Sequence, residues 1–165
     1  MGSKDLISYS ECSHPNLVLF MGITIGTNEY SIISEYMKNK SLWHNLHEIK
    51  QQFSAQEKIN LIEAVAKGMT YLHERDICHY SLKSQNILMD EGMTAKISDF
   101  GLRNYKHFGE DPDQPVPQHS EKFMVGTSSG NSMQTDNEYW ICPEIFNGEK
   151  YDTKSDVYSF GVLMW

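Results

Sequence analysis

Two stretches decide the fold: His79–Asn86, which reads HYSLKSQN, and Asp99–Gly101, which reads DFG. Two brief apolar runs lie between them, Ile87–Met89 and Ala95–Ile97, and the turn residues Asp90–Gly92 separate these runs. This order predicts a short β-hairpin. The first strand of a hairpin starts beside the point where the second strand ends. The polar residues that come directly before and after the hairpin are therefore held near each other.

A long helix is expected before these stretches. Ser54 and Glu57 form the sequence pattern of a capping box, in which the serine hydroxyl accepts an orphan N–H and the glutamate reaches back. Apolar residues then recur at spacings of three and four, which places them on one face of a helix of about five turns. They are Ile59, Ile62, Val65, Met69 and Leu72. We expect this helix to lie in the core.

Further elements are expected toward both ends of the chain. They are a helix tail at Asp5–Cys12, a hairpin of two strands at Leu17–Phe20 and Tyr30–Ile33 with turn residues between Ile23 and Asn28, a short helix at Ser41–Ile49, and the start of a buried helix at Val157–Trp165. Between them, Asn104–Asn137 is rich in Gly, Pro, Ser, Asp and Gln and poor in aliphatic residues. That composition predicts a mobile loop.

The composition is that of a single soluble domain: 165 residues, of which 39% are hydrophobic and 22% charged. The formal net charge of −8 argues against nucleic acid or an anionic membrane as the partner, because phosphate binding requires a basic surface. Cys12, Cys78 and Cys142 fit no zinc spacing, and we expect free thiols in a reducing compartment, hence a cytoplasmic protein. No apolar run reaches the length of a membrane span.

The HYSLKSQN and DFG stretches resemble the catalytic loop, H-R-D-L-x-x-x-N, and the metal-binding D-F-G triplet of protein kinases. Other segments resemble the same family in the same order. They are His14–Val18 in the small lobe, Ser34 with Glu35–Met37 at the hinge, Cys142–Glu144 at the A-P-E triplet, and Ser155–Gly161 at the start of the helix that follows. Lys83 is similar to the Ser/Thr-specific pattern. The sequences of His14–Asn16 and Leu82–Ser84 resemble those of the tyrosine-kinase-like group, near Raf and the mixed-lineage kinases.

The resemblance implies an α+β, bilobal kinase-like fold that is truncated. Residues 1–37 would form a remnant of the small lobe with the hinge, and residues 38–165 part of the helical lobe, with a mobile activation segment at about 104–137. No Gly-rich loop and no strand lysine precede His14, so we expect a partial domain. The family's internal hydrophobic spine would contain His79 and Phe100, with Tyr9 and Phe20 as further members.

The resemblance also implies the site residues. In the catalytic loop they are Ser81, at the position of the catalytic aspartate, with Lys83 and His79. The residues implied for the nucleotide are Ser34, Glu35, Met37 and Leu88. Asn86 and Asp99 would hold Mg²⁺. The implied cofactors are ATP and Mg²⁺, and we expect weak binding because the phosphate clamp is lacking.

Two departures from the family pattern concern the chemistry. The family's aspartate accepts the proton of the substrate hydroxyl, whereas Ser81 has no basic function near neutral pH. Loss of a general base typically costs ~10²–10⁴ in rate. Tyr80 replaces the arginine that usually pairs with a phosphate in the activation segment, so control through that residue would be lost.

Three hypotheses follow from these departures. The first is a pseudokinase that acts by binding other signalling proteins or kinases, or nucleotide; restoring the acid by Ser81→Asp should then change little. The second is an active Ser/Thr kinase whose other lobe lies in a longer product, with Asp76 or Asp90 as a weak replacement for the missing acid. The third is a truncated gene product that does not fold stably.

Overall fold

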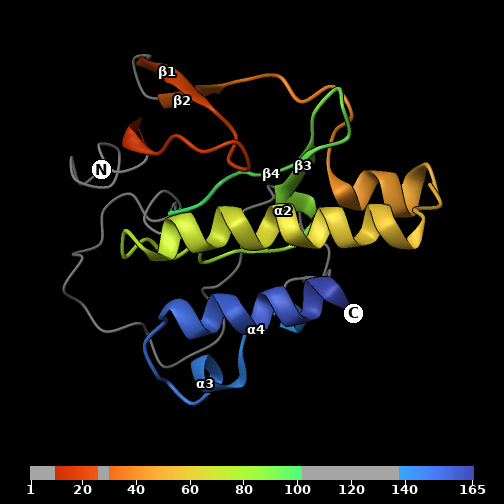
Figure 1. Ribbon diagram of the computed structural model, residues 1–165. Coiled ribbons are helices and arrows are strands. Elements are labelled where there is room, and N and C mark those ends of the chain that lie inside the picture. The colour runs from red at the N-terminus through yellow and green to blue at the C-terminus, as the bar shows by residue number, and fades with distance from the viewer. Residues whose placement is uncertain (1–9, 26–29, 102–137) are drawn as a thin grey trace, which may run out of the picture.

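The computed structural model describes residues 10–25, 30–101 and 138–165. Its elements in chain order are strands β1 (Phe20–Ile25) and β2 (Tyr30–Ser34), the π-helix η1 (His44–Glu48), helix α2 (Ala55–His73), the 3₁₀ helix η2 (Ser84–Asn86), strands β3 (Ile87–Met89) and β4 (Ala95–Ile97), the 3₁₀ helix η5 (Glu138–Trp140), and helices α3 (Pro143–Phe146) and α4 (Thr153–Met164). Figure 1 shows three tiers: the β1–β2 hairpin, then β3 and β4 with α2, then α4 with α3. The fold is mixed α+β, as the sequence indicates.

Helix α2 begins where the capping box predicts. The Ser54 hydroxyl accepts the N–H of Glu57 at 3.3 Å, and the Glu57 carboxylate accepts the N–H of Ser54 at 2.7 Å. The C-terminal half of the helix buries the predicted apolar face, with Val65, Met69 and Leu72 in the core. Ile59 is wrongly predicted as a core residue: its side chain is 56% exposed, because the described chain packs only against the later turns of the helix.

The β3–β4 hairpin has the predicted bounds and is the centre of the fold. Its strands pair antiparallel, with Ile87 opposite Ile97. Two further segments extend it: the backbone of Asn16 and Val18 bonds to both sides of Ile97, and that of residues 39–40 bonds to Met89. Four chain segments therefore lie side by side over α2.

The first strand is shifted from its predicted position. The run Leu17–Phe20 is not a strand; Leu17 instead forms an isolated parallel bridge with Ile97, and β1 begins only at Phe20. β1 then pairs antiparallel with β2, which confirms the predicted hairpin. An apolar run shows that a segment is extended or buried, but it does not show which strand the segment joins.

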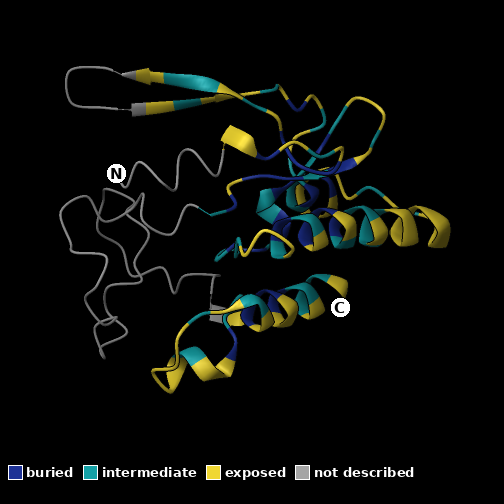
Figure 2. Ribbon diagram, turned by 60° about the vertical axis from the view of Figure 1, so that its left-hand side comes forward, coloured by how far each residue is buried: buried dark blue, intermediate teal, exposed yellow. Residues whose placement is uncertain are grey.

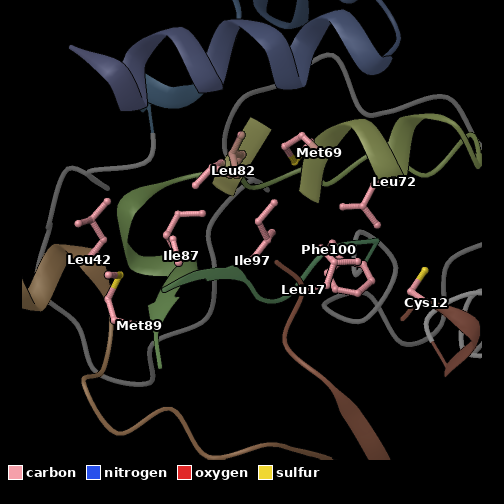
Figure 3. Close-up of a cluster of buried hydrophobic side chains, with 12 residues drawn as sticks. Cys12, Leu17, Leu42, Met69, Leu72, Leu82, Ile87, Met89, Ile97 and Phe100 are labelled. Atoms are coloured by element: carbon pink, nitrogen blue, oxygen red, sulfur yellow. The ribbon is translucent and has the colours of Figure 1, made fainter. Parts of the chain in front are cut away.

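Buried apolar side chains fill the space between the β3–β4 hairpin and α2, as Figure 3 shows, and Figure 2 marks the buried residues of the chain in dark blue. This core consists of Cys12, Leu17, Leu42, Val65, Met69, Leu72, Leu82, Ile87, Met89, Ala95, Ile97 and Phe100. Of the expected spine, His79 and Phe100 are both buried, and Phe20 packs against the core. Tyr9 and the loop Asn104–Asn137 lie outside the described residues.

Helix α4 buries polar residues, which the sequence pattern does not predict. It starts at Thr153, after an Asp152 cap, and its buried residues are Ser155, Asp156 and Ser159. Val157 is 59% exposed and Trp165 fully exposed, whereas Phe160 and Leu163 are partly buried against the core, so the predicted apolar burial of this helix is found only in part. In the part of the chain that the structure describes, no helix has the length and apolar character needed to cross a membrane.

Gly68 in α2 lies close to the hairpin, and Gly161 in α4 provides a comparison. A Cβ at Gly68 would lie 2.7 Å from the Ile97 Cδ1 and 2.9 Å from the carbonyl oxygen of Asn16, whereas a Cβ at Gly161 in α4 would meet nothing within 4 Å. The Asn16 oxygen cannot move easily, since it accepts the N–H of Ile97.

We expect Gly68→Ala to lower the free energy of unfolding by roughly 1–3 kcal/mol, because overpacking outweighs the gain in helix propensity. Gly161→Ala is the matched control, and it should raise that free energy by about 0.5–1 kcal/mol. Urea unfolding of both variants checks this. Stabilisation by both substitutions would show that α2 does not lie this close to the hairpin.

Candidate functional site

The carboxylate of Asp156 fixes the start of the HYSLKSQN loop. This side chain is completely buried. Its Oδ2 accepts the N–H of His79 at 2.8 Å and its Oδ1 accepts the N–H of Tyr80 at 3.2 Å. The Nε2 of His73, at the end of α2, lies 2.9 Å from Oδ2. One side chain of α4 thus joins the loop to α2.

Tyr151 adds a further donor and an aromatic contact. Its hydroxyl donates to Oδ1 of Asp156 at 2.5 Å, and its ring centroid lies 4.8 Å from that of Tyr80. Burial, together with the adjacent Asp156 carboxylate, raises the pKa of Tyr151, so its hydroxyl stays protonated as a donor. Tyr80 has a φ of +68°, a left-handed conformation that is strained for this residue type and persists only where neighbouring contacts enforce it.

His79 is placed as a packing residue rather than as a proton carrier. It is buried, and burial lowers the pKa of its imidazole, although the Asp156 charge opposes that shift. Its Nδ1 accepts the N–H of Ser81 at 3.3 Å. A neutral imidazole in this position shapes the loop.

The structure brings Ser81, Asn86 and Asp99 together at the ends of the β3–β4 hairpin. The Asn86 Nδ2 donates to the Ser81 carbonyl at 2.7 Å and lies 3.5 Å from the Ser81 hydroxyl. Ser98 links Asn86 to Asp99: its hydroxyl lies 3.1 Å from the Asn86 carbonyl oxygen and 3.3 Å from Oδ2 of Asp99. The three expected residues therefore form one polar group. Lys83 caps η2 beside them, and its carbonyl accepts the N–H of Asn86.

Neither proposed replacement acid contacts Ser81. Asp90 is committed to the β3–β4 turn, where its Oδ1 accepts the N–H groups of Gly92 and Thr94. Asp76 is exposed and belongs to the turn that ends α2. A serine hydroxyl therefore occupies the position of the expected general base, with no carboxylate from these two residues beside it.

At the expected hinge, the Glu35 side chain is held by the hairpin. The Lys96 ammonium donates to both of its carboxylate oxygens, at 2.8 and 2.9 Å, and the N–H of Leu19 donates at 2.8 Å. Burial alone would raise the pKa of the Glu35 carboxyl, but the bonds from Lys96 and Leu19 outweigh it and hold that pKa below its ordinary value. The carboxylate is thus ionised and occupied, so it is the backbone of this segment that can meet a ligand.

Two backbone groups of the hinge are available. The Glu35 N–H bonds to Leu19 and the Met37 carbonyl accepts from Lys40, but the Glu35 carbonyl and the Met37 N–H make no hydrogen bond among the described residues. Met37 itself is buried, Ser34 is exposed, and Leu88 is half-buried. The segment therefore offers one acceptor and one donor two residues apart.

Sequence reasoning missed the residues that organise this site. Asp156 stands in a stretch that resembles the family, yet only the structure shows its bonds to the loop; His73, Tyr151 and Lys96 carry no local signal at all. Two depressions at the described surface lie away from this site, one of about 340 Å³ beside Tyr71 and one of about 260 Å³ beside Phe53. Neither is lined by Ser81, Asn86 or Asp99.

Comparison with known proteins identifies the relatives. The family model described as "Protein tyrosine and serine/threonine kinase" matches residues 4–165. The serine/threonine-protein kinase CTR1 of Arabidopsis thaliana is 36% identical over 156 residues, 92% of this chain and 17% of the relative. A probable serine/threonine-protein kinase of Dictyostelium discoideum is 39% identical over 96% of this chain and 14% of its own length. The probable serine/threonine-protein kinase SIS8 of Arabidopsis thaliana is 34% identical over 92% of this chain and 13% of its own length. The chain thus spans less than a fifth of the length of these relatives.

The Glu35–Lys96 pair is expected to stabilise the hinge in a pH-dependent way. Lys96→Met keeps the side-chain length and removes the ammonium, and it should lower the free energy of unfolding by roughly 1–2 kcal/mol at neutral pH. Because the folded-state pKa of Glu35 is depressed, the contribution is present above the unfolded value of about 4.3 and is lost as pH falls through the folded value.

Urea unfolding from neutral pH down to about pH 3 measures this difference. The control is Lys38→Met, which breaks an exposed pair with Glu91, in which the two side chains are 62% and 78% exposed, and should change little. A Lys96→Met effect of the same size at every pH would contradict the role given to Glu35.

Proposed function

The chain belongs to the protein kinase family, and from that premise we propose that it is a pseudokinase domain, which binds a partner or nucleotide and transfers phosphate slowly or not at all. The serine/threonine kinases among its relatives support ancestry on the Ser/Thr side. On this proposal, residues 1–37 correspond to part of the small lobe and hinge, and residues 38–165 to part of the helical lobe. The partners would be other signalling proteins or kinases in the cytoplasm.

One observation carries the proposal: Ser81 occupies the loop position where phosphoryl transfer needs a proton acceptor. The Ser81 backbone is held by Asn86 and His79, which supports a fixed position for its side chain. A hydroxyl takes up no proton near neutral pH. The expected loss, ~10²–10⁴ in rate, is large enough to separate a signalling enzyme from a binding module.

The remaining residues fit ATP and Mg²⁺, the cofactors that the family resemblance implies. The Asn86 amide donates to Ser81 through Nδ2, its Oδ1 accepts no hydrogen bond among the described residues, and Asp99 is exposed. Amide and carboxylate oxygens are the ligands Mg²⁺ prefers. At the hinge, the Glu35 carbonyl and Met37 N–H match the donor and acceptor on the edge of an adenine ring, with Ser34 and Leu88 nearby. When bound, the metal would neutralise phosphate charge.

A second candidate, an active Ser/Thr kinase within a longer product, is favoured by the intact Asn86–Asp99 pair. It would need an acid other than Asp76 and Asp90 to act in place of Ser81, because the Asp90 carboxylate is held in the β3–β4 turn and Asp76 lies in the exposed turn that ends α2. The third hypothesis, a chain that does not fold stably, predicts the absence of a cooperative thermal melt.

Phosphotransfer to a generic peptide tests the proposal. We expect the purified chain to transfer radiolabelled phosphate at least ~10²-fold more slowly than an active family member. Ser81→Ala should leave any residual rate unchanged, because the hydroxyl supplies no base and the loop bonds of residue 81 are made by its backbone. Brisk labelling by the wild type, or loss of the residual rate in Ser81→Ala, would refute the pseudokinase assignment.

The metal role of Asp99 has a matched control. Asp99 and Asp76 are both exposed and have φ values of +57° and +56°, a conformation that Asn tolerates well. In a nucleotide titration, we expect Mg²⁺ to tighten binding to the wild type and to Asp76→Asn. Asp99→Asn should lose roughly tenfold of that tightening, about 1.4 kcal/mol, while metal-free affinity stays the same. Equal behaviour of the two variants would exclude Asp99 as a metal ligand.

A further inference from the structure

The start of the HYSLKSQN loop adopts an unfavourable backbone conformation and is nevertheless ordered. Tyr80 has a φ of +68°, a left-handed conformation that is strained for a bulky residue. Two kinds of contact hold it there: its N–H donates to Asp156, and its ring lies against Tyr151 at a centroid distance of 4.8 Å. The backbone contact and the side-chain contact of Tyr80 are thus made by two neighbouring residues, Asp156 and Tyr151.

Tyr151 contributes to both contacts. Its ring meets Tyr80, and its hydroxyl donates to the same Oδ1 of Asp156 that accepts the Tyr80 N–H. The hydroxyl therefore orients the acceptor that the loop uses. Because the ring and the protonated hydroxyl are neutral, this arrangement needs no charged group, such as a phosphate, from elsewhere in the chain.

We propose that Tyr151 is a positioning residue: its hydroxyl on Asp156 and its ring against Tyr80 hold the loop from Tyr80 to Asn86 in the conformation that meets a ligand. The loop is therefore pre-ordered in the unmodified chain. The proposal goes beyond the proposed function and depends on it only for the identity of that ligand.

The chain offers a conservative variant and a matched control. Tyr151→Phe keeps the ring and removes the hydroxyl. Tyr158→Phe removes a hydroxyl from α4 itself, on a residue that is 40% exposed and makes no hydrogen bond among the described residues. Tyr151→Leu removes the aromatic ring as well as the hydroxyl, and it reports the combined contribution wherever that variant folds.

Hydrogen exchange reads the loop directly, because the amides of His79 and Tyr80 both donate to Asp156. In Tyr151→Phe we expect exchange of these two amides to accelerate about tenfold or more, while amides of the buried half of α2 change less than about twofold. Tyr158→Phe should match the wild type. The affinity for Mg²⁺ with nucleotide should fall in parallel in Tyr151→Phe.

Two exchange results would overturn the proposal. Unchanged exchange at His79 and Tyr80 in Tyr151→Phe would show that the hydroxyl holds nothing. Equal acceleration in α2 would show that Tyr151 contributes only to global stability. Faster loop exchange with unchanged nucleotide affinity would also count against the positioning role. If the wild type binds no nucleotide, the ligand part of the proposed function fails, and the exchange comparison still decides the role of Tyr151.

Discussion

The carboxylate of Asp156 is completely buried, and donors from three separate parts of the chain converge on it. An ionised carboxylate in the interior costs several kcal/mol unless hydrogen bonds replace its water. Here His73, the backbone of His79 and Tyr80, and the Tyr151 hydroxyl supply those bonds. The constraint is mutual, because the loop needs the carboxylate to keep its conformation and the carboxylate needs the loop to stay buried.

This constraint explains why α4 does not follow the usual rule for a helix that meets a core. Its buried positions carry Ser155, Asp156 and Ser159, and Ser159 donates to the carbonyl of Trp140 at 2.6 Å. Through Asp156 and Ser159 the helix contacts backbone groups of a loop and of η5. Polar side chains satisfy such groups, whereas apolar side chains would leave them unpaired. Of the apolar residues of α4, Phe160 and Leu163 are partly buried against the core, whereas Val157 and Met164 are exposed.

The parts of the fold that sequence predicts are those whose cause is local. The bounds of β3 and β4 follow from two apolar runs and one turn, and α2 begins at a capping box whose two residues are neighbours along the chain. The bonds that join Asp156 to His73, His79 and Tyr80 span 76 to 83 positions, and no local pattern reports them. The prediction of a strand at Leu17–Phe20 is wrong for the same reason. The hydrophobicity of this segment is local, but the partner of Leu17, Ile97, is distant along the chain. Ser81, Asn86 and Asp99 could be grouped in advance because the hairpin between the last two is short.

The way the loop is held also explains how the position of the base can change while the site keeps its shape. Asp156 bonds to the backbone of His79 and Tyr80, and the side chain of Asn86 bonds mainly to the backbone carbonyl of Ser81. None of these contacts requires a particular side chain at position 81. The side chain at position 81 can therefore change at little cost to these bonds, so under the proposed function the chemistry of transfer and the architecture of binding are separable. A chain in which the first is lost can therefore retain the second, which is the physical basis for a binding role in a protein of kinase ancestry.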